Sequence, residues 1–284
     1  MSRWNWIGAG LALLALAAAF AAGGHPGLYL NLAGFAIVAA GTAGAALLSY
    51  PLGDLRAAWR VARNALTVEP PGGDAIVETL MDLSVRSRRD GILALEAAGD
   101  QSTVSFLKRA LDLLVDGYRG AELREILYTE MEYFRLRRTH HERIFRHLAR
   151  LAPAFGVAGS VVGLIGMLGG IGDPEVIVRM IPIALTSTLY GILAANFLFV
   201  PLAECIHAKT RRELLAQKLI SDGVLAIASE HNTLRLQKKL ESFLTPAERP
   251  RPVASLEELR ERYRRLREQE EARTQGRQEA EAQG

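Results

Sequence analysis

Residues 4–53 read WNWIGAGLALLALAAAFAAGGHPGLYLNLAGFAIVAAGTAGAALLSYPLG and contain no Asp, Glu, Lys or Arg, a run of 50 residues. A helix crosses the hydrocarbon core of a bilayer with about 20 predominantly apolar residues, so this run is long enough for two spans. The cluster Gly23-Gly24-His25-Pro26-Gly27 divides it, because glycine and proline mark turns. The run therefore predicts a hairpin of two membrane helices, at about 4–22 and 28–50.

A cleaved secretory signal peptide is the alternative interpretation of the first span. Arg3, the apolar run and the pair Ala21-Ala22 resemble the parts of such a signal. We favour the hairpin because the apolar run is longer than a usual signal core and a second span follows after five residues.

Two further stretches without charged residues, 151–172 and 180–203, predict a second hairpin joined by Gly172-Asp173-Pro174-Glu175. The fold class expected is therefore an all-α membrane protein, with four transmembrane helices in two hairpins, 1–50 and 151–203. This pattern excludes a soluble enzyme of ordinary composition.

The polar blocks are also predicted to be helical. The block 51–150 carries 16 Lys and Arg against 15 Asp and Glu, and its apolar residues recur at helical spacing, as in Ile76, Leu80 and Leu83. It predicts a helical domain between the second and third spans. The tail divides into amphipathic helices over 204–245 and a charged helical or flexible segment over 246–284.

The distribution of basic residues predicts the orientation. Of 34 Lys and Arg, 32 lie in 51–150 or in the tail from 204 onward, and cytoplasmic loops carry such an excess. Both termini and the 51–150 block are therefore expected in the cytoplasm. Because this rule accounts for much of the basic charge, no nucleic-acid partner is predicted.

The predicted spans contain no Asp, Glu, Lys or Arg, whereas proton relays and ion pumps use ionisable residues inside the membrane. If the protein conducts ions, another chain must supply the carboxylate. Phosphate-binding and nucleophile-elbow motifs are absent, His140 and His141 are adjacent and so diverge on a helix, and Cys205 is alone. The sequence thus predicts no enzyme activity, metal or cofactor.

Small and hydroxyl residues mark the second hairpin. One helical stripe of glycines permits close packing in lipid, and prolines lie near both cytoplasmic ends. The hydroxyl groups either bond to carbonyls of their own helix or form a polar wall for an ion. The glycines are Gly156, Gly159, Gly163 and Gly166, the hydroxyl residues are Ser160, Thr186, Ser187 and Thr188, and the prolines are Pro153 and Pro201. We expect Pro153 near a helix start, and Pro201 to bend or stop its helix.

These residues resemble the MotA/TolQ/ExbB proton-channel family, and in particular its motility protein A branch. The resemblance rests on LAPAFG (151–156), GSVVGL (159–164) and ALTSTLYG (184–191), followed by Pro201. SRRDGILALE (87–96) is similar to the branch's Arg-x-x-Gly-x-Leu-x-Leu-Glu signature, and Val115-Asp116-Gly117 also matches. The likeness covers about residues 5–245.

The resemblance implies a stator subunit of the bacterial flagellar motor, a multi-pass protein of the inner membrane. Five copies would surround two copies of a single-span partner, motility protein B, which brings the ion-binding Asp and anchors to peptidoglycan. Ion flow would turn the ring, and the cytoplasmic block would push the rotor's switch protein.

The resemblance also implies roles for residues. Arg88 and Glu96, with the adjacent Arg89, match positions that engage the rotor, and Pro153 and Pro201 match prolines that couple ion flow to movement. Ser160 and Thr188 match hydroxyl positions near the ion path. The transported ion is a proton or sodium, and we favour sodium because hard cations take oxygen ligands. Pro182 departs from the pattern of the family.

Three alternatives remain open. The first is a TolQ/ExbB-type energiser, whose members usually have three spans. The second is another ion-driven machine, for gliding or phage defence, and the third is a membrane scaffold that conducts no ions.

Overall fold

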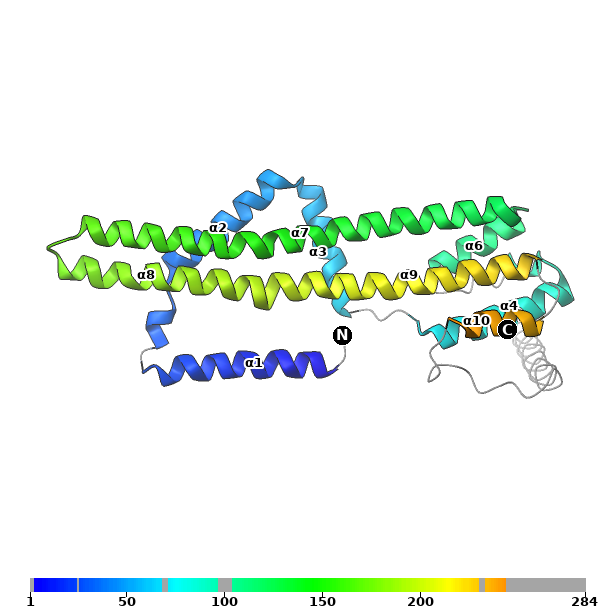
Figure 1. Ribbon diagram of the computed structural model, residues 1–284, viewed down its shortest axis with the longest axis horizontal. Helices are drawn as coiled ribbons and strands as arrows, with labels where there is room; N and C mark the ends of the chain where they lie inside the picture. Colours follow the sequence, from blue (N-terminus) through cyan, green and yellow to red (C-terminus); the bar gives the residue numbers. More distant parts are fainter. Residues whose placement is uncertain (1–2, 25, 68–70, 97–103, 230–232, 244–284) are drawn as a thin grey trace, which may run out of the picture.

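The computed structural model describes residues 3–24, 26–67, 71–96, 104–229 and 233–243, and all of its regular elements are helices (Figure 1). This confirms the all-α prediction for the described residues. The predicted segment 246–284 lies outside them. In chain order the elements are α1 (Arg3–Ala22), a 3-10 turn η1 (Pro26–Tyr29), α2 (Leu32–Ser49), α3 (Leu52–Thr67), α4 (Gly73–Asp90), α6 (Ser105–Val115), α7 (Gly120–Gly169), α8 (Pro174–Leu193), a π-helical segment η2 (Ala194–Phe199), α9 (Val200–Ser229) and α10 (Thr233–Glu241).

Local capping sets where the apolar helices begin. The Asn31 side chain accepts a hydrogen bond from the backbone N–H of Gly34 at the start of α2, and Asp173 accepts one from Glu175 at the start of α8. Such caps satisfy N–H groups that a first helical turn leaves without a partner. Because Asp173 caps the helix and Pro174 occupies its first turn, α8 begins six residues before the predicted span.

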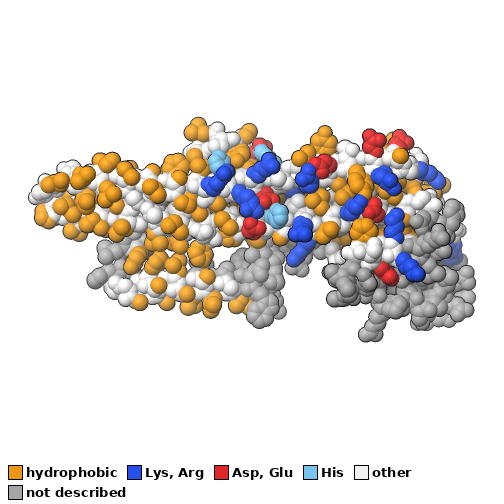
Figure 2. All heavy atoms as spheres, in the orientation of Figure 1, with side chains coloured by type: hydrophobic (Ala, Val, Ile, Leu, Met, Phe, Trp, Pro, Cys, Tyr) orange, Lys and Arg blue, Asp and Glu red, His pale blue; other side chains and the backbone are white. Residues whose placement is uncertain are grey.

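Two long antiparallel rods form the body of the protein. One is α7, with 50 residues, or about 75 Å at the rise of an α-helix. The other is the run α8–η2–α9, which lies beside α7 along its length (Figure 1). A hydrocarbon core of about 30 Å accommodates less than half of either rod. Figure 2 shows the division: one half of the visible face carries only apolar and uncharged groups, and the other carries the Lys, Arg, Asp and Glu side chains.

Three described helical segments are long and apolar enough to cross a membrane: α2, part of α7, and part of the α8–η2–α9 run. They correspond to the second, third and fourth predicted spans. The first predicted span forms helix α1, which exposes Ile7, Leu11 and Leu14. That α1 also crosses the membrane stays a prediction.

The boundaries at 150 and 203 predicted from charge lie inside continuous helices. Pro153 is within α7, 33 residues after its first residue, and not at a helix start. Pro201 does not stop its helix, because α9 runs on to Ser229; the irregularity is the π-helical segment immediately before it. The helices therefore pass from the apolar half into the charged half without a break.

An apolar core holds the helices at the far charged end. Leucines of α4, α6, α7, α9 and α10 converge there, and Leu80, Leu111, Leu123 and Leu240 are fully buried. Leu80 packs against Gly223 of α9, where a Cβ would lie 2.6 Å from one of its methyl carbons. Burial of these side chains fixes the 71–96 segment against the end of the long rods.

We predict that Leu80→Ala destabilises this leucine core by about 2–5 kcal/mol, the usual range for a buried leucine truncation. The thermal unfolding temperature of the purified full chain in detergent measures the effect. Leu93→Ala is the matched control, because Leu93 is 74% exposed and its truncation should cost less than about 0.5 kcal/mol. Equal unfolding temperatures for the two variants would contradict the assignment of Leu80 to the core.

Candidate functional site

The four glycines of the 156–166 stripe all face α8. A Cβ at Gly163 would lie 2.7 Å from the backbone nitrogen of Ala184, and one at Gly156 would lie 2.9 Å from the carbonyl oxygen of Ser187. At Gly159 and Gly166 the nearest atoms belong to side chains of α8. Contacts this short to backbone leave no room for a side chain, so glycine allows α7 and α8 to approach closely.

Gly191 of α8 makes the reciprocal contact. A Cβ there would lie 2.5 Å from the carbonyl oxygen of Ala152 and 3.0 Å from Cα of Pro153. Pro153 is thus at the crossing of the two helices. Sequence reasoning did not select Gly191; its spacing of three residues from Thr188 on the same helix is the signal that was available.

Ser160 and Thr188 bridge the two helices at this crossing. The Ser160 Oγ and Thr188 Oγ1 atoms lie 2.5 Å apart, and Ser160 also donates to the carbonyl oxygen of Ala184 at 2.5 Å. The carbonyl oxygen of Gly156 lies 3.3 Å from Ser160 Oγ and 3.4 Å from Thr188 Oγ1. Two hydroxyls and two carbonyls from both helices therefore form one compact group of oxygen atoms, and both side chains are half-buried.

Thr186 and Ser187 occupy a different position. Their hydroxyls donate to carbonyls of their own helix, Thr186 to Pro182 and Ser187 to Ile183, which is the alternative that the sequence left open for membrane hydroxyls. Both side chains are buried, and a Cβ at Gly34 of α2 would lie 2.9 Å from each hydroxyl oxygen. Ser187 also borders α7, because a Cβ at Gly159 would lie 2.6 Å from its Oγ, but only Ser160 and Thr188 join α7 and α8 through their hydroxyls.

Tyr190 links the turn before α2 to α8. Its hydroxyl donates to the carbonyl oxygen of Tyr29 and accepts from the backbone N–H of Asn31, and its ring makes an edge contact with Phe35. This places α2 against the same end of α8 that carries the hydroxyl residues.

The π-helical segment follows this site along the chain. Within it, the Asn196 amide donates to the carbonyl oxygen of Ile192. Pro201, which lacks an N–H, comes two residues after its end. Short π-helical turns inside α-helices occur frequently at functional sites.

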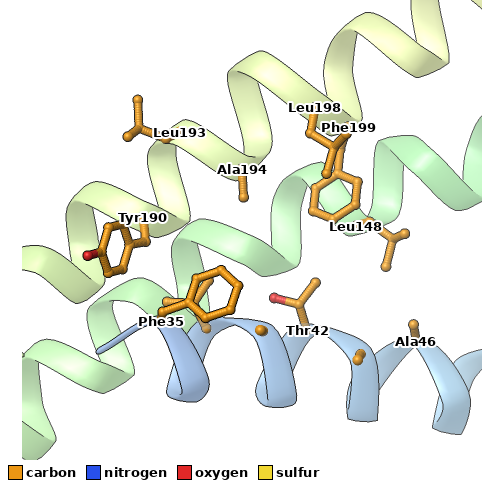
Figure 3. Close-up of a pocket in the computed structure, with 12 residues that line it drawn as sticks. Phe35, Thr42, Ala46, Leu148, Tyr190, Leu193, Ala194, Leu198 and Phe199 are labelled. Atoms are coloured by element: carbon orange, nitrogen blue, oxygen red, sulfur yellow. The ribbon is translucent and has the colours of Figure 1, made fainter. Parts of the chain in front are cut away.

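A groove of about 540 Å³ lies between the π-helical segment, α2 and α7, and Figure 3 shows the residues that line it. Its lining is almost entirely apolar, with Phe35 and Ala46 from α2, Leu148 from α7 and Phe199 from η2. Thr42 also lines it, and the Thr42 hydroxyl is buried with no hydrogen-bond partner in the described part of the chain.

Arg88, Arg89 and Glu96 lie at and beyond the end of α4 (Figure 1). This is the opposite end of the protein from the hydroxyl pair of Ser160 and Thr188. All three side chains are exposed, and Arg89 lies 3.7 Å from Asp90. Gly91 ends α4 with φ +83°, a conformation that favours glycine. A turn then buries Leu95 and leaves Glu96 outside.

The two candidate sites are therefore separate and are joined by the long rods. The hydroxyls of Ser160 and Thr188 provide neutral oxygen ligands and hydrogen-bond partners, and the stretches 151–172 and 180–203 around them contain no Asp, Glu, Lys, Arg or His. The 88–96 segment presents exposed charges of both signs. Gly34 was not selected from the sequence either, because its contact with α8 joins helices far apart in the chain and leaves no local pattern.

Comparison with known proteins is consistent with this architecture. Residues 98–218 match the MotA/TolQ/ExbB proton channel family. Chemotaxis protein PomA of Vibrio alginolyticus is 30% identical over 80% of this chain and 89% of that protein, and motility protein A of Borreliella burgdorferi is 34% identical over 64% and 70%.

Solved structures agree. The structure of MotAB from C. jejuni superimposes with a TM-score of 0.80 at 26% identity, covering 90% of this chain and 100% of that one. The flagellar MotAB stator complex from Bacillus subtilis gives a TM-score of 0.72 at 26% identity, covering 78% and 88%. From the sequence relatives, and in agreement with the fold, this chain belongs to the MotA/TolQ/ExbB proton channel family and is a homologue of MotA and PomA.

Proposed function

We propose that this protein is a stator subunit of the bacterial flagellar motor. With a single-span MotB-like partner it forms an ion channel in the inner membrane, and ion flow through this channel drives torque on the rotor. The relatives named motility protein A and the MotAB stator structures support this assignment.

The observation that carries the proposal is the hydroxyl bridge between Ser160 and Thr188. It lies in the apolar half of the protein, in a hairpin whose stretches 151–172 and 180–203 contain no ionisable residue. Proton relays and ion pumps use such a residue inside the membrane. A partner that contributes one carboxylate beside the bridge completes the pathway.

The ion proposed is sodium. Ser160 Oγ, Thr188 Oγ1 and the carbonyl oxygens of Gly156 and Ala184 lie within hydrogen-bond distance of one another or of a common neighbour. A hard cation that has lost water takes oxygen ligands of this kind, whereas a proton needs only a titratable group and a water chain.

The charged end transmits the movement in this proposal. Arg88, Arg89 and Glu96 engage the rotor's switch protein, and the rods α7 and α8–η2–α9 connect them to the ion pathway. Pro153, at the Gly191 crossing, and Pro201, after the π-helical segment, are the positions where the rods adapt to ion occupancy.

The proposed assembly is a ring of five copies around two partner chains, in which α1 and α2 form the first membrane hairpin. Both termini and the 51–150 block face the cytoplasm. The basic residues support this orientation, since 32 of 34 lie in that block or in the tail. Exposed apolar side chains such as Val161, Ile165 and Leu185 provide surface for lipid and for neighbouring chains.

We predict that Thr188→Val abolishes ion-driven motility, because it keeps the shape of the side chain and removes the hydroxyl oxygen. Thr188→Ser keeps that oxygen and should retain motility. Swimming in soft agar measures both, with immunoblots to show equal amounts in the membrane. If the protein were a scaffold that conducts no ions, cells with either variant would swim equally well. That result would refute the proposed pathway.

Reversing charges at the rotor-facing segment should reduce torque. We expect Arg88→Glu and Glu96→Arg each to slow a tethered-cell motor, and a complementary charge change on the switch protein to restore part of the speed. Arg137→Glu is the control, because Arg137 is exposed on α7 away from this segment. Full speed in both single variants would remove Arg88 and Glu96 from the interface.

The ion is tested by the driving force. Swimming speed should rise with external sodium and persist after a protonophore collapses the proton gradient. If swimming speed does not change with external sodium and swimming stops after the protonophore is added, the pathway conducts protons. The stator assignment would stand in that case.

A further inference from the structure

Helix α3 presents a basic and aromatic face to the outside. The side chains of Arg56, Arg60 and Arg63 are exposed, and Trp59 and Leu52 are 58% and 56% exposed. At 3.6 residues per turn these five positions fall within an arc of about 100°. We call Leu52, Arg56, Trp59, Arg60 and Arg63 the basic face.

The opposite side of α3 fixes the direction of the basic face. Ala58, Ala62 and Ala65 are buried and pack in one cluster with Ile144 of α7 and Ala203 of α9. Alanines allow the helix to lie close to both rods, and rotation about its axis would expose this cluster. The basic face is therefore held outward by packing.

Polar contacts hold both ends of α3 to the rods. His140 Nε2 lies 3.2 Å from Asp54 Oδ2 near the start of the helix, and Lys209 Nζ donates to the carbonyl oxygen of Asn64 at 2.8 Å near its end. Burial lowers the pKa of Lys209. A cation near the last carbonyls of a helix satisfies groups that have no partner within it.

The basic face has no acidic neighbour on its own helix. Asp54 is the only acid of α3, and it pairs with His140 on the rod. None of Arg56, Arg60 and Arg63 forms an ion pair with any residue that the structure describes. Three exposed cations on one face thus remain available to an anionic partner.

The position of α3 identifies that partner. The helix begins three residues after the last residue of α2, a helix long and apolar enough to span a membrane. Figure 1 shows it running steeply across α7 and α9, so that it lies along the membrane surface when the rods stand across the membrane. Tryptophan is enriched at the membrane–water interface, where the phosphate groups of lipids also lie.

We propose that the basic face of α3 binds the headgroups of anionic phospholipids in the leaflet next to the charged half of the protein. The planar guanidinium group matches phosphate geometry, and Trp59 and Leu52 insert between headgroups. This lipid site does not depend on the stator assignment; it requires only that α2 spans the membrane.

The test is a lipid titration of the detergent-purified full chain. The thermal unfolding temperature of the protein is measured at each lipid concentration. Phosphatidylglycerol should raise this temperature, and phosphatidylcholine should raise it much less, because a ligand of the folded state stabilises it. In the variant Arg56→Gln/Arg60→Gln/Arg63→Gln, the phosphatidylglycerol concentration for half the shift should rise roughly a hundredfold, since each arginine near an anionic surface contributes about fivefold.

The matched control replaces three exposed arginines elsewhere in the charged half, Arg124→Gln/Arg137→Gln/Arg212→Gln, and should behave as the unmodified chain. If the basic-face variant does not accumulate, the unmodified chain is titrated at low and high potassium chloride, and high salt should weaken the phosphatidylglycerol effect.

Three results would overturn the proposal. The first is an equal half-shift concentration for the basic-face and control variants. The second is an equal effect of phosphatidylcholine. The third is a full shift with inorganic phosphate alone, which would make the face a site for free anions and not for lipid.

Discussion

The close contact between α7 and α8 is the interaction on which the rest of the apolar half depends. At Gly156, Gly163 and Gly191 the neighbouring helix approaches to a distance that excludes any side chain. In lipid, helices gain little from burying apolar surface against one another, so association rests on van der Waals contact and hydrogen bonds. The glycines supply the first, and the Ser160–Thr188 bridge supplies the second. A larger residue at Gly163 would separate the backbones and with them the two hydroxyls.

The same two helices carry this contact into the charged half. Neither Pro153 nor Pro201 ends its helix; the first lies at the Gly191 crossing and the second follows a π-helical turn. Irregular turns of this kind bend a helix and preserve its continuity. The packed rods and the leucine core around Leu80 form a continuous structural connection between the Ser160–Thr188 bridge and the 88–96 segment.

A second packed cluster, where α3 meets the rods, lies between these ends. Its alanines and the contacts of Asp54 and Asn64 hold α3 across the rods. This cluster has the composition of a soluble core, whereas the α7–α8 contact has that of a membrane interface. Packing in this cluster gives the arginines of α3 a fixed direction.

The distribution of charge determined most of the fold. Runs without Asp, Glu, Lys or Arg are long enough to span a bilayer only as helices, since backbone groups in lipid must bond within their own segment. Helical class and the second, third and fourth apolar segments followed from this. The family resemblance came from a separate signal, the motifs around Gly156, Gly163 and Thr188. The expectation of no enzyme activity agrees with a family of ion channels.

Tertiary structure decided what local pattern does not contain. The sequence left Ser160, Thr186, Ser187 and Thr188 as one group, and only the helix crossing separates the bridging pair from the pair that bonds to its own helix and packs on Gly34. The tertiary structure also placed Pro153 inside a helix and a π-helical turn before Pro201. Packing against a neighbouring helix can hold a helix together across a proline. Spacing along one helix defines a face, but which neighbour meets that face depends on contacts between residues far apart in the chain.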